Sequence, residues 1–367
     1  MKAIAIVPGT KTVHFVDRPE PSISRPDEIK VRVLQVGICG TDREEVSGGR
    51  AEAPKGAQEL IFGHEMIGQV VAVGEQVTRV QPDDFAVFTV RRGCGSCLPC
   101  LMNRSDMCLT GDYRERGIKG MDGYQAEYVV DTEPYIVRVP RELKDIGVLC
   151  EPMSVVVKAI DEAVRLQMTR LPSAPSTPDW LYGRRCLVSG LGPVGLLGAL
   201  VLRLHNAEVH GLDIVNADSA RPQWLSGIGG HYIDGRQVAA EKIQDTVGAM
   251  DFIFEATGVP KLAFNLIDAL GRNGVYVLLG IPGNDGTISL PAAELMQRIV
   301  LSNQVMIGSV NAARGHFQMA IDYLLQAHPR WGAFINRLIT AHYPYADYAQ
   351  ALFTHDPNEI KVVVDYE

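Results

Sequence analysis

Four cysteines are concentrated in one short segment of the chain, where their spacing could hold a metal ion. Residues 91–108, RRGCGSCLPCLMNRSDMC, carry the pattern C-x2-C-x2-C-x7-C. Four thiolates that leave no coordination position free form the closed tetrahedral site expected of structural zinc. Bacterial ferredoxins begin with the same pattern but continue x3-C-P, which is absent here. We therefore predict structural zinc bound by Cys94, Cys97, Cys100 and Cys108, with an iron–sulfur cluster or metal-free thiols as the alternatives.

The number of cysteines and the size of the chain argue against a disulfide scaffold. The sequence has 367 residues, 46% of them hydrophobic, and seven cysteines, so at least one cysteine has no partner within the chain. A chain of this length builds its stability from buried cores and is expected to form two domains. The first residues, MKAIAIVPGTKTVHF, predict a strand. The sequence contains no uninterrupted apolar run of about 20 residues, so we expect no membrane span. We expect a cytoplasmic protein with reduced thiols.

A second possible metal site is divided among three segments: VGICGTD at 36–42, FGHEM at 62–66 and LCEPM at 149–153. Cys39, His64 and Glu151 could supply sulfur, nitrogen and oxygen to zinc and leave the fourth position open, as a catalytic zinc site requires. Taken singly, a buried cysteine is more often a small core residue, and a histidine more often a hydrogen-bonding one.

A glycine-rich turn in the second half of the chain predicts a dinucleotide site. Residues 190–195, GLGPVG, follow the apolar strand CLVSG and open a helix, so a pyrophosphate could approach the helix N-terminus. Asp213 stands 23 positions beyond Gly190, where a carboxylate binds ribose hydroxyls and repels a 2′-phosphate. NAD is favoured, while Asp218 and Arg221 in the next loop leave NADP open. The alternative is a structural turn. The predicted cofactor-binding residues of this motif are Gly190, Gly192, Pro193, Val194, Gly195 and Asp213.

The pattern of elements changes along the chain. The first ~150 residues contain short β-type runs such as IKVRVLQVGIC and MIGQVVAVGEQV. A polar, proline-rich loop at 169–180 then follows a predicted helix at 152–167. Beyond it strands alternate with helices, among them a predicted helix at 261–271, which indicates a doubly wound parallel sheet.

Taken together, G-x-C-G-T-D, G-H-E, the four-cysteine segment, E-P and GLGPVG resemble the zinc-dependent medium-chain dehydrogenase/reductase family. The resemblance covers nearly the whole chain and implies an α/β fold with two parts. Residues 1–155 would form a GroES-like distorted β-barrel catalytic domain, and 156–304 a Rossmann domain with a doubly wound parallel sheet. Residues 305–367 would return to the catalytic domain. The resemblance also implies two zinc ions per subunit and a homodimer or homotetramer.

Within that family, the segment CEPMSVVVKAI resembles the polyol and aldose branch and places Glu151 at a zinc-ligand position. The segments TVRRGC (89–94), ERGIKGMDGY (115–124) and GSVNAARGHF (308–317) resemble microbial glucose dehydrogenases. Glu115 and Asn311 then become candidates to bind sugar hydroxyls, together with Glu151, Thr41 and, more weakly, Thr89; Asn311 is also a cofactor candidate.

The resemblance also assigns roles around the predicted catalytic zinc. Glu65 would contact zinc or its water and serve as a base, Thr41 would pass a proton towards the nicotinamide ribose, and Asp42 would orient His64.

The expected reaction is oxidation of an aldose at C1, with D-glucose giving glucono-1,5-lactone and NAD receiving the hydride. A polyol, secondary-alcohol or threonine dehydrogenase of the same family is the nearest alternative. A zinc-stabilised NAD-binding regulator without turnover is the non-enzymatic one. The net charge of −8 makes nucleic acid an unlikely partner, and no membrane partner is expected.

Overall fold

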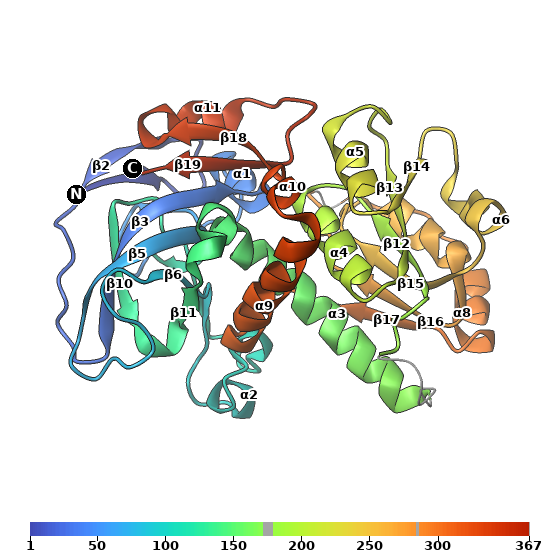
Figure 1. The fold of residues 1–367 in the computed structure, drawn as a ribbon, viewed down its shortest axis with the longest axis horizontal. Helices are drawn as coiled ribbons and strands as arrows, with labels where there is room; N and C mark the ends of the chain where they lie inside the picture. The colour runs from blue at the N-terminus through green and yellow to red at the C-terminus, as the bar shows by residue number, and fades with distance from the viewer. Residues whose placement is uncertain (172–178, 284–285, 367) are drawn as a thin grey trace. The chain divides into compact units, whose positions relative to one another are not determined.

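The computed structural model of the chain describes residues 1–171, 179–283 and 286–366, which form two compact units (Figure 1). The first unit combines Met1–Ser154, Asn311–Leu325 and Ile335–Glu367, and the second combines Val155–Val310 and Gln326–Phe334. Compactness does not assign a role to either unit, so the domain bounds given above remain a prediction. Of the predicted loop at 169–180, residues 172–178 lie outside the described residues.

The first unit is built on a seven-stranded sheet with the order β11-β6-β5-β3-β19-β18, in which β10 also pairs with β3. The C-terminal strand β19 runs antiparallel to β3, with Val364 opposite Val36, so that red and blue strands lie side by side in Figure 1. The bounds are β3 (Glu28–Ile38), β5 (Glu65–Val73), β6 (Phe85–Phe88), β10 (Tyr128–Thr132), β11 (Ile136–Val139), β18 (Ile339–Pro344) and β19 (Lys361–Asp365).

Two small sheets and several short helices complete this unit. One sheet joins β2 (Val13–Asp17), β1 (Lys2–Ile6) and β4 (Leu60–Ile61), and the other joins β7 (Arg91–Arg92), β8 (Arg114–Arg116) and β9 (Gly120–Met121). The helices are α1 (Gly40–Val46), α2 (Leu98–Leu101) and α11 (Tyr348–Phe353), with 3-10 turns at Ser105–Met107, Glu133–Tyr135, Arg141–Leu149 and Tyr345–Asp347. Apolar side chains from both ends of the chain, among them Ile4, Ile38, Phe62 and Val364, share one core.

The second unit contains a six-stranded, entirely parallel sheet with the order β14-β13-β12-β15-β16-β17. This confirms the predicted doubly wound sheet. Its strands are β12 (Arg185–Ser189), β13 (Glu208–Asp213), β14 (His231–Asp234), β15 (Met250–Glu255), β16 (Leu270–Leu278) and β17 (Val305–Gly308). Helix α4 (Pro193–Leu204) packs against β12 and β13. The other helices are α5 (Ala220–Gly227), α6 (Ile243–Val247), α7 (Pro260–Asn265) and α8 (Ala292–Leu301), with 3-10 turns at Ala240–Lys242 and Leu266–Ala269.

Three further helices are α3 (Cys150–Arg170), α9 (Arg314–Trp331) and α10 (Ala333–Asn336). The helix predicted at 152–167 is present within α3, but the helix predicted at 261–271 is wrong in extent. Helix α7 ends at Asn265, a 3-10 turn buries Leu266 and Ile267 in the core, and Leu270 already pairs with Met250 in the sheet. In the described parts of the chain, no helix has the length and apolarity needed to cross a membrane.

Candidate active site

A buried group of metal-ligating side chains lies where β3 ends and α1 begins. Cys39 Sγ is 3.1 Å from His64 Nε2, and the ligand atoms of Cys39, His64 and Glu65 all lie within 4.8 Å of one another. Cys39 also caps α1, because its Sγ accepts from Thr41 N at 3.1 Å and its own N–H donates to Asp42 Oδ2 at 2.8 Å. The turn from strand to helix therefore fixes the thiol.

Asp42 lies beside the imidazole, as its predicted role requires. Asp42 Oδ1 is 3.4 Å from His64 Nδ1, and the two residues are 0% and 5% exposed. Burial alone would lower the pKa of His64, but the adjacent Cys39 and Asp42 raise it well above its usual value. A carboxylate against Nδ1 leaves Nε2 directed at Cys39, the orientation that a metal-binding histidine needs.

Glu65 is paired with a lysine that the sequence analysis missed. Lys361 Nζ is 2.8 and 2.6 Å from the two carboxylate oxygens of Glu65 and donates to Ile38 O at 3.1 Å. Both side chains are buried, with Lys361 1% and Glu65 2% exposed. A Cβ at Gly37 would stand 2.2 Å from Glu65 Oε2, so glycine leaves the room that this carboxylate occupies. The signal in the sequence was a lysine within the apolar run IKVVV.

Glu151 lies in the first turn of α3 and is not one of the three residues grouped within 4.8 Å. Burial raises the pKa of its carboxyl to about 7. The positive charge of His64 lowers that pKa, whereas the negative charge of Glu65 raises it. The thiol, imidazole and carboxylates around this point offer sulfur, nitrogen and oxygen donors in buried surroundings. That donor set fits zinc, because a cation compensates buried carboxylates and a thiolate.

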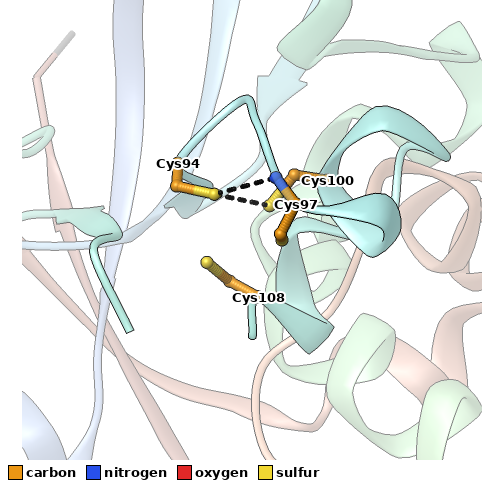
Figure 2. A group of neighbouring side chains, drawn as sticks. All are labelled: Cys94, Cys97, Cys100 and Cys108. Carbon is orange, nitrogen blue, oxygen red and sulfur yellow. Dashed lines mark hydrogen bonds between the residues drawn. The ribbon is translucent and has the colours of Figure 1, made fainter. Parts of the chain in front are cut away.

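The second group of ligands is the four-cysteine lobe, which we define as residues 91–108. Its four side chains point towards one another (Figure 2), and their sulfur atoms all lie within 4.8 Å. No disulfide links them, and Cys94 Sγ accepts hydrogen bonds from Cys97 N and Ser96 Oγ, both at 3.4 Å. The Ser96 hydroxyl is the largest of the hydrogen-bond effects that lower the pKa of Cys94 to about 5, which favours a thiolate ligand. The lobe fits a closed zinc site.

The two predicted sugar-binding residues meet in the first unit. Asn311 Nδ2 donates to Glu115 Oε1 at 2.5 Å, although 196 positions separate the residues. Arg91, which the sequence analysis did not single out, forms an ion pair with the same Glu115 oxygen at 3.0 Å. Thr89 makes no hydrogen bond to either predicted residue within the described part of the chain. Its hydroxyl accepts from Arg92 Nη1 at 3.2 Å, and the residue lines a cavity of about 570 Å³.

The glycine-rich turn lies in the second unit between β12 and α4. Gly190 has φ +88°, and a Cβ at Gly195 would stand 1.8 Å from Gly190 O, so neither position accepts a side chain without rearrangement. Pro193 and Val194 open α4 after Gly192 at its N-cap. Asp213 ends β13 and its Oδ2 accepts from Leu191 N at 2.8 Å. Arg221 Nη1 is 3.8 Å from the same oxygen. The arrangement brings the predicted acidic residue to the phosphate-binding turn.

Comparison with known proteins places the chain in a family. Residues 144–366 match the family model described as glucose dehydrogenase C-terminus, and residues 25–141 match the alcohol dehydrogenase GroES-like domain. The chain is 37% identical to glucose 1-dehydrogenase of Methanocella arvoryzae, over 100% of this chain and 99% of that protein. It is also 37% identical to glucose 1-dehydrogenase of Thermoproteus tenax, over 100% of both.

A solved structure agrees with this relationship. The Haloferax mediterranei glucose dehydrogenase, in complex with NADP, Zn and gluconolactone, superposes with a TM-score of 0.88 at 33% identity, over 100% of this chain and 99% of that chain. The fold predicted from the sequence, a GroES-like part with a Rossmann sheet, is thereby confirmed. The chain belongs to the glucose dehydrogenase branch of the zinc-dependent medium-chain dehydrogenase/reductase family.

Proposed function

We propose that this protein oxidises D-glucose at C1 to glucono-1,5-lactone, with NAD as the preferred acceptor. The balanced reaction converts glucose and NAD⁺ to the lactone, NADH and one proton. Similarity to glucose 1-dehydrogenases over the whole chain supports the reaction class. The observation that carries the choice of an aldose is the contact between Glu115 and Asn311, two residues matched to the glucose branch that lie far apart in the sequence.

The buried ligand group would hold the catalytic zinc. Cys39, His64 and Glu151 would be ligands, with Glu65 contacting the metal or its water. Bound zinc supplies a Lewis acid that lowers the pKa of the C1 hydroxyl, and bound NAD accepts the hydride. The four-cysteine lobe would hold the second, structural zinc through Cys94, Cys97, Cys100 and Cys108.

Of the remaining groups around Cys39, Thr41 and Glu65 would transfer the proton, and Asp42 would orient His64. Thr41 stands two positions after Cys39, and its hydroxyl would carry the proton of the C1 hydroxyl towards the nicotinamide ribose. Glu65 would act as the base, and its ion pair with Lys361 compensates the charge of a buried carboxylate. Asp42 would keep His64 in the tautomer that presents Nε2 to the metal.

The sugar would be held by Glu115 and Asn311, assisted by Glu151 and Thr41, since a carboxylate and an amide can accept from and donate to adjacent hydroxyls. Thr89 is the weakest member of the proposed set, because its hydroxyl already accepts from Arg92. Asn311 would also contact the cofactor.

The preference for NAD rests on Asp213 at the end of β13, whose carboxylate would bind the ribose hydroxyls and repel a 2′-phosphate. Gly190, Gly192, Pro193, Val194 and Gly195 would hold the pyrophosphate. NADP is proposed as a weaker acceptor, since a guanidinium, Arg221, stands 3.8 Å from Asp213 and the Haloferax relative binds NADP.

We further propose that residues 1–155 form the catalytic domain, 156–304 the cofactor domain and 305–367 a segment that returns to the first. A homodimer or homotetramer is supported by the edge strand β17 and by α8, which exposes Met296, Val300 and Leu301. A cytoplasmic location is supported by seven free thiols, which a reducing compartment preserves.

The test is a set of initial rates on the zinc-loaded protein with NAD and NADP in parallel. Glucose, galactose, xylose, sorbitol, threonine and a simple secondary alcohol are compared. We expect a cyclic aldose, glucose first, to give the highest kcat/KM, and NAD to exceed NADP. Preference for sorbitol, threonine or the secondary alcohol would refute the sugar site while keeping the family chemistry. If no substrate gives reduction of NAD or NADP, the alternative of a regulator without turnover is favoured.

A further inference from the structure

Arg91 is buried between the proposed sugar-binding carboxylate and the four-cysteine lobe. It belongs to β7 and lies directly opposite Glu115 of β8 in the antiparallel register. Arg91 is 6% exposed and Glu115 is 9% exposed. A buried arginine with its charge matched to one carboxylate fixes the position of that carboxylate more firmly than an exposed pair would.

The guanidinium of Arg91 uses all three of its nitrogens. Nε and Nη2 donate to Glu115 Oε1 at 3.1 and 3.0 Å, and Nη1 donates to Asp106 O at 3.0 Å. Its carbon also lies 3.9 Å from the centre of the Tyr113 ring. Because the guanidinium is planar and its donors form a rigid fork, these contacts set one orientation that lysine could not reproduce.

The contacts leave one oxygen of Glu115 available. Both Arg91 and Asn311 donate to Oε1, and Oε2 accepts no hydrogen bond within residues 1–171, 179–283 and 286–366. A carboxylate oxygen accepts strongly from hydroxyl groups, so Oε2 is the atom of Glu115 best suited to a sugar hydroxyl. Arg91 thus determines where that oxygen points.

The other end of Arg91 is attached to the lobe. Asp106 lies in the 3-10 turn Ser105–Met107, immediately before the ligand Cys108. Nε and Nη2 of Arg104 donate to the side chain of Asp106, and Ser105 Oγ donates to Arg91 O at 3.4 Å. A metal held by the four cysteines would hold Cys108, and through it the carbonyl to which Arg91 donates.

We propose that Arg91 is a positioning residue that ties the aldose-binding carboxylate Glu115 to the four-cysteine lobe. Zinc in the lobe then sets the affinity for the sugar without contacting it. This inference rests on the proposed function, since it requires Glu115 to bind a sugar hydroxyl.

The first test is steady-state kinetics of Arg91→Gln with glucose and NAD. Removing the fork frees Glu115 to turn, so the KM for glucose should rise about tenfold, the effect of losing one hydrogen bond to a charged group. The KM for NAD should stay within about twofold and kcat within about threefold, because the contact is equally present in ground and transition states. Arg91→Lys keeps the charge without the fork and should still raise the KM for glucose several-fold.

The matched control is Arg114→Gln, which removes the same charge from the adjacent, exposed position of β8. It should leave the KM for glucose unchanged. If Arg114→Gln raised that KM as much as Arg91→Gln, the effect would be general electrostatics and the inference would be wrong. If the wild type oxidises glucose and Arg91→Gln leaves the KM for glucose unchanged, the inference about Arg91 is wrong while the proposed function stands. A wild-type protein that does not oxidise glucose would overturn the proposed function.

The link to the lobe is tested by a double-mutant cycle with Cys97→Ser. If both changes act through one path, the double variant should raise the glucose KM no more than the larger single effect. Amide hydrogen exchange gives a readout independent of turnover, because Glu115 N donates to Lys119 O at 2.8 Å. Cys97→Ser should speed exchange in peptides covering 113–121 and leave 185–213 unchanged. If the two changes raise the KM for glucose additively and amide exchange at 113–121 is unchanged, the lobe does not act on the sugar site through Arg91, and the link is contradicted.

Discussion

The two groups of metal-ligating residues in the first unit use cysteine in opposite surroundings. In the four-cysteine lobe all ligands come from one short segment, and the sulfurs sit near the surface among hydroxyl and amide donors. Around Cys39 the candidate ligands come from separate segments, and the titratable side chains of Asp42, His64 and Glu65 are buried. The first arrangement fits a closed ion site, whereas the second would leave a coordination position open beside groups that can take or give a proton.

The difference is visible in the thiols themselves. Burial raises the pKa of the Cys39 thiol, while hydrogen bonding, led by the Ser96 hydroxyl, lowers that of Cys94 to about 5. Hydrogen bonds from its own loop therefore favour the thiolate form of Cys94, which is the form that binds a metal. The sulfur of Cys39 depends on His64 and the cation it is to bind.

The largest expected effect distinguishes the two sites by activity. Cys39→Ser should lower kcat/KM for glucose by about 1,000-fold, because it removes a ligand of the ion that stabilises charge on the reacting oxygen. Its circular dichroism spectrum should stay close to that of the wild type. Substantial turnover in this variant would show that the Cys39 group is not the catalytic site.

The next effect tests the buried ion pair between Lys361 and Glu65 in the Cys39 region. Lys361→Met leaves the buried Glu65 carboxyl without its ion-pair partner, which should lower the free energy of unfolding by about 3 kcal/mol. Adding Glu65→Gln should recover much of that loss, because no buried charge then lacks a partner. Denaturant unfolding of the two variants measures the difference, and equal losses would mean that the pair contributes nothing special.

Removing a cysteine ligand from the four-cysteine lobe should lower the stability of the protein more than its activity. Cys97→Ser should reduce the zinc content from two ions per chain towards one and lower the free energy of unfolding by about 2 kcal/mol, the contribution of a bound ligand that is lost. The kcat at saturating glucose should remain within about threefold of the wild type, and any rise in the KM should be confined to the sugar. Metal analysis and thermal unfolding provide the measurement.

The last effect depends on pH and concerns Glu45, a buried carboxyl next to the Cys39 region. Glu45 is 0% exposed, and neither carboxylate oxygen accepts a hydrogen bond from the described residues. Burial raises its pKa from 4.5 to about 9, so between these values the folded state holds a proton that the unfolded state has released. The contribution of Glu45 to stability is therefore complete below pH 4.5 and is lost as the pH rises towards 9.

Glu45→Gln should remove this dependence in the metal-free protein. We expect the gain in the free energy of unfolding to grow from little at pH 5 to several kcal/mol at pH 8. Glu44→Gln is the matched control, because Glu44 is the neighbouring exposed carboxylate. A gain for Glu45→Gln that is equal at both pH values would show that the carboxyl titrates normally.

Local patterns predicted much of both sites, and long-range pairing accounts for what they missed. The four cysteines and GLGPVG are short segments whose spacing alone determines which atoms converge. Lys361 reaches Glu65 only because β19 pairs with β3, and Arg91 reaches Glu115 only because β7 pairs with β8. The helix predicted at 261–271 was too long for a similar reason, since pairing of Leu270 with Met250 draws that residue into a strand. Helical periodicity in the sequence contains no information about such partners.

We propose that one zinc ion acts in catalysis and that the other does not. The most direct measurement is a zinc titration of metal-free Cys97→Ser protein, with bound zinc and glucose-dependent NAD reduction followed in the same samples at saturating glucose. We predict that kcat rises in proportion to the first zinc bound and reaches most of the wild-type value at one ion per chain. Absence of turnover with that ion bound, or turnover that persists in a parallel titration of Cys39→Ser, would contradict it.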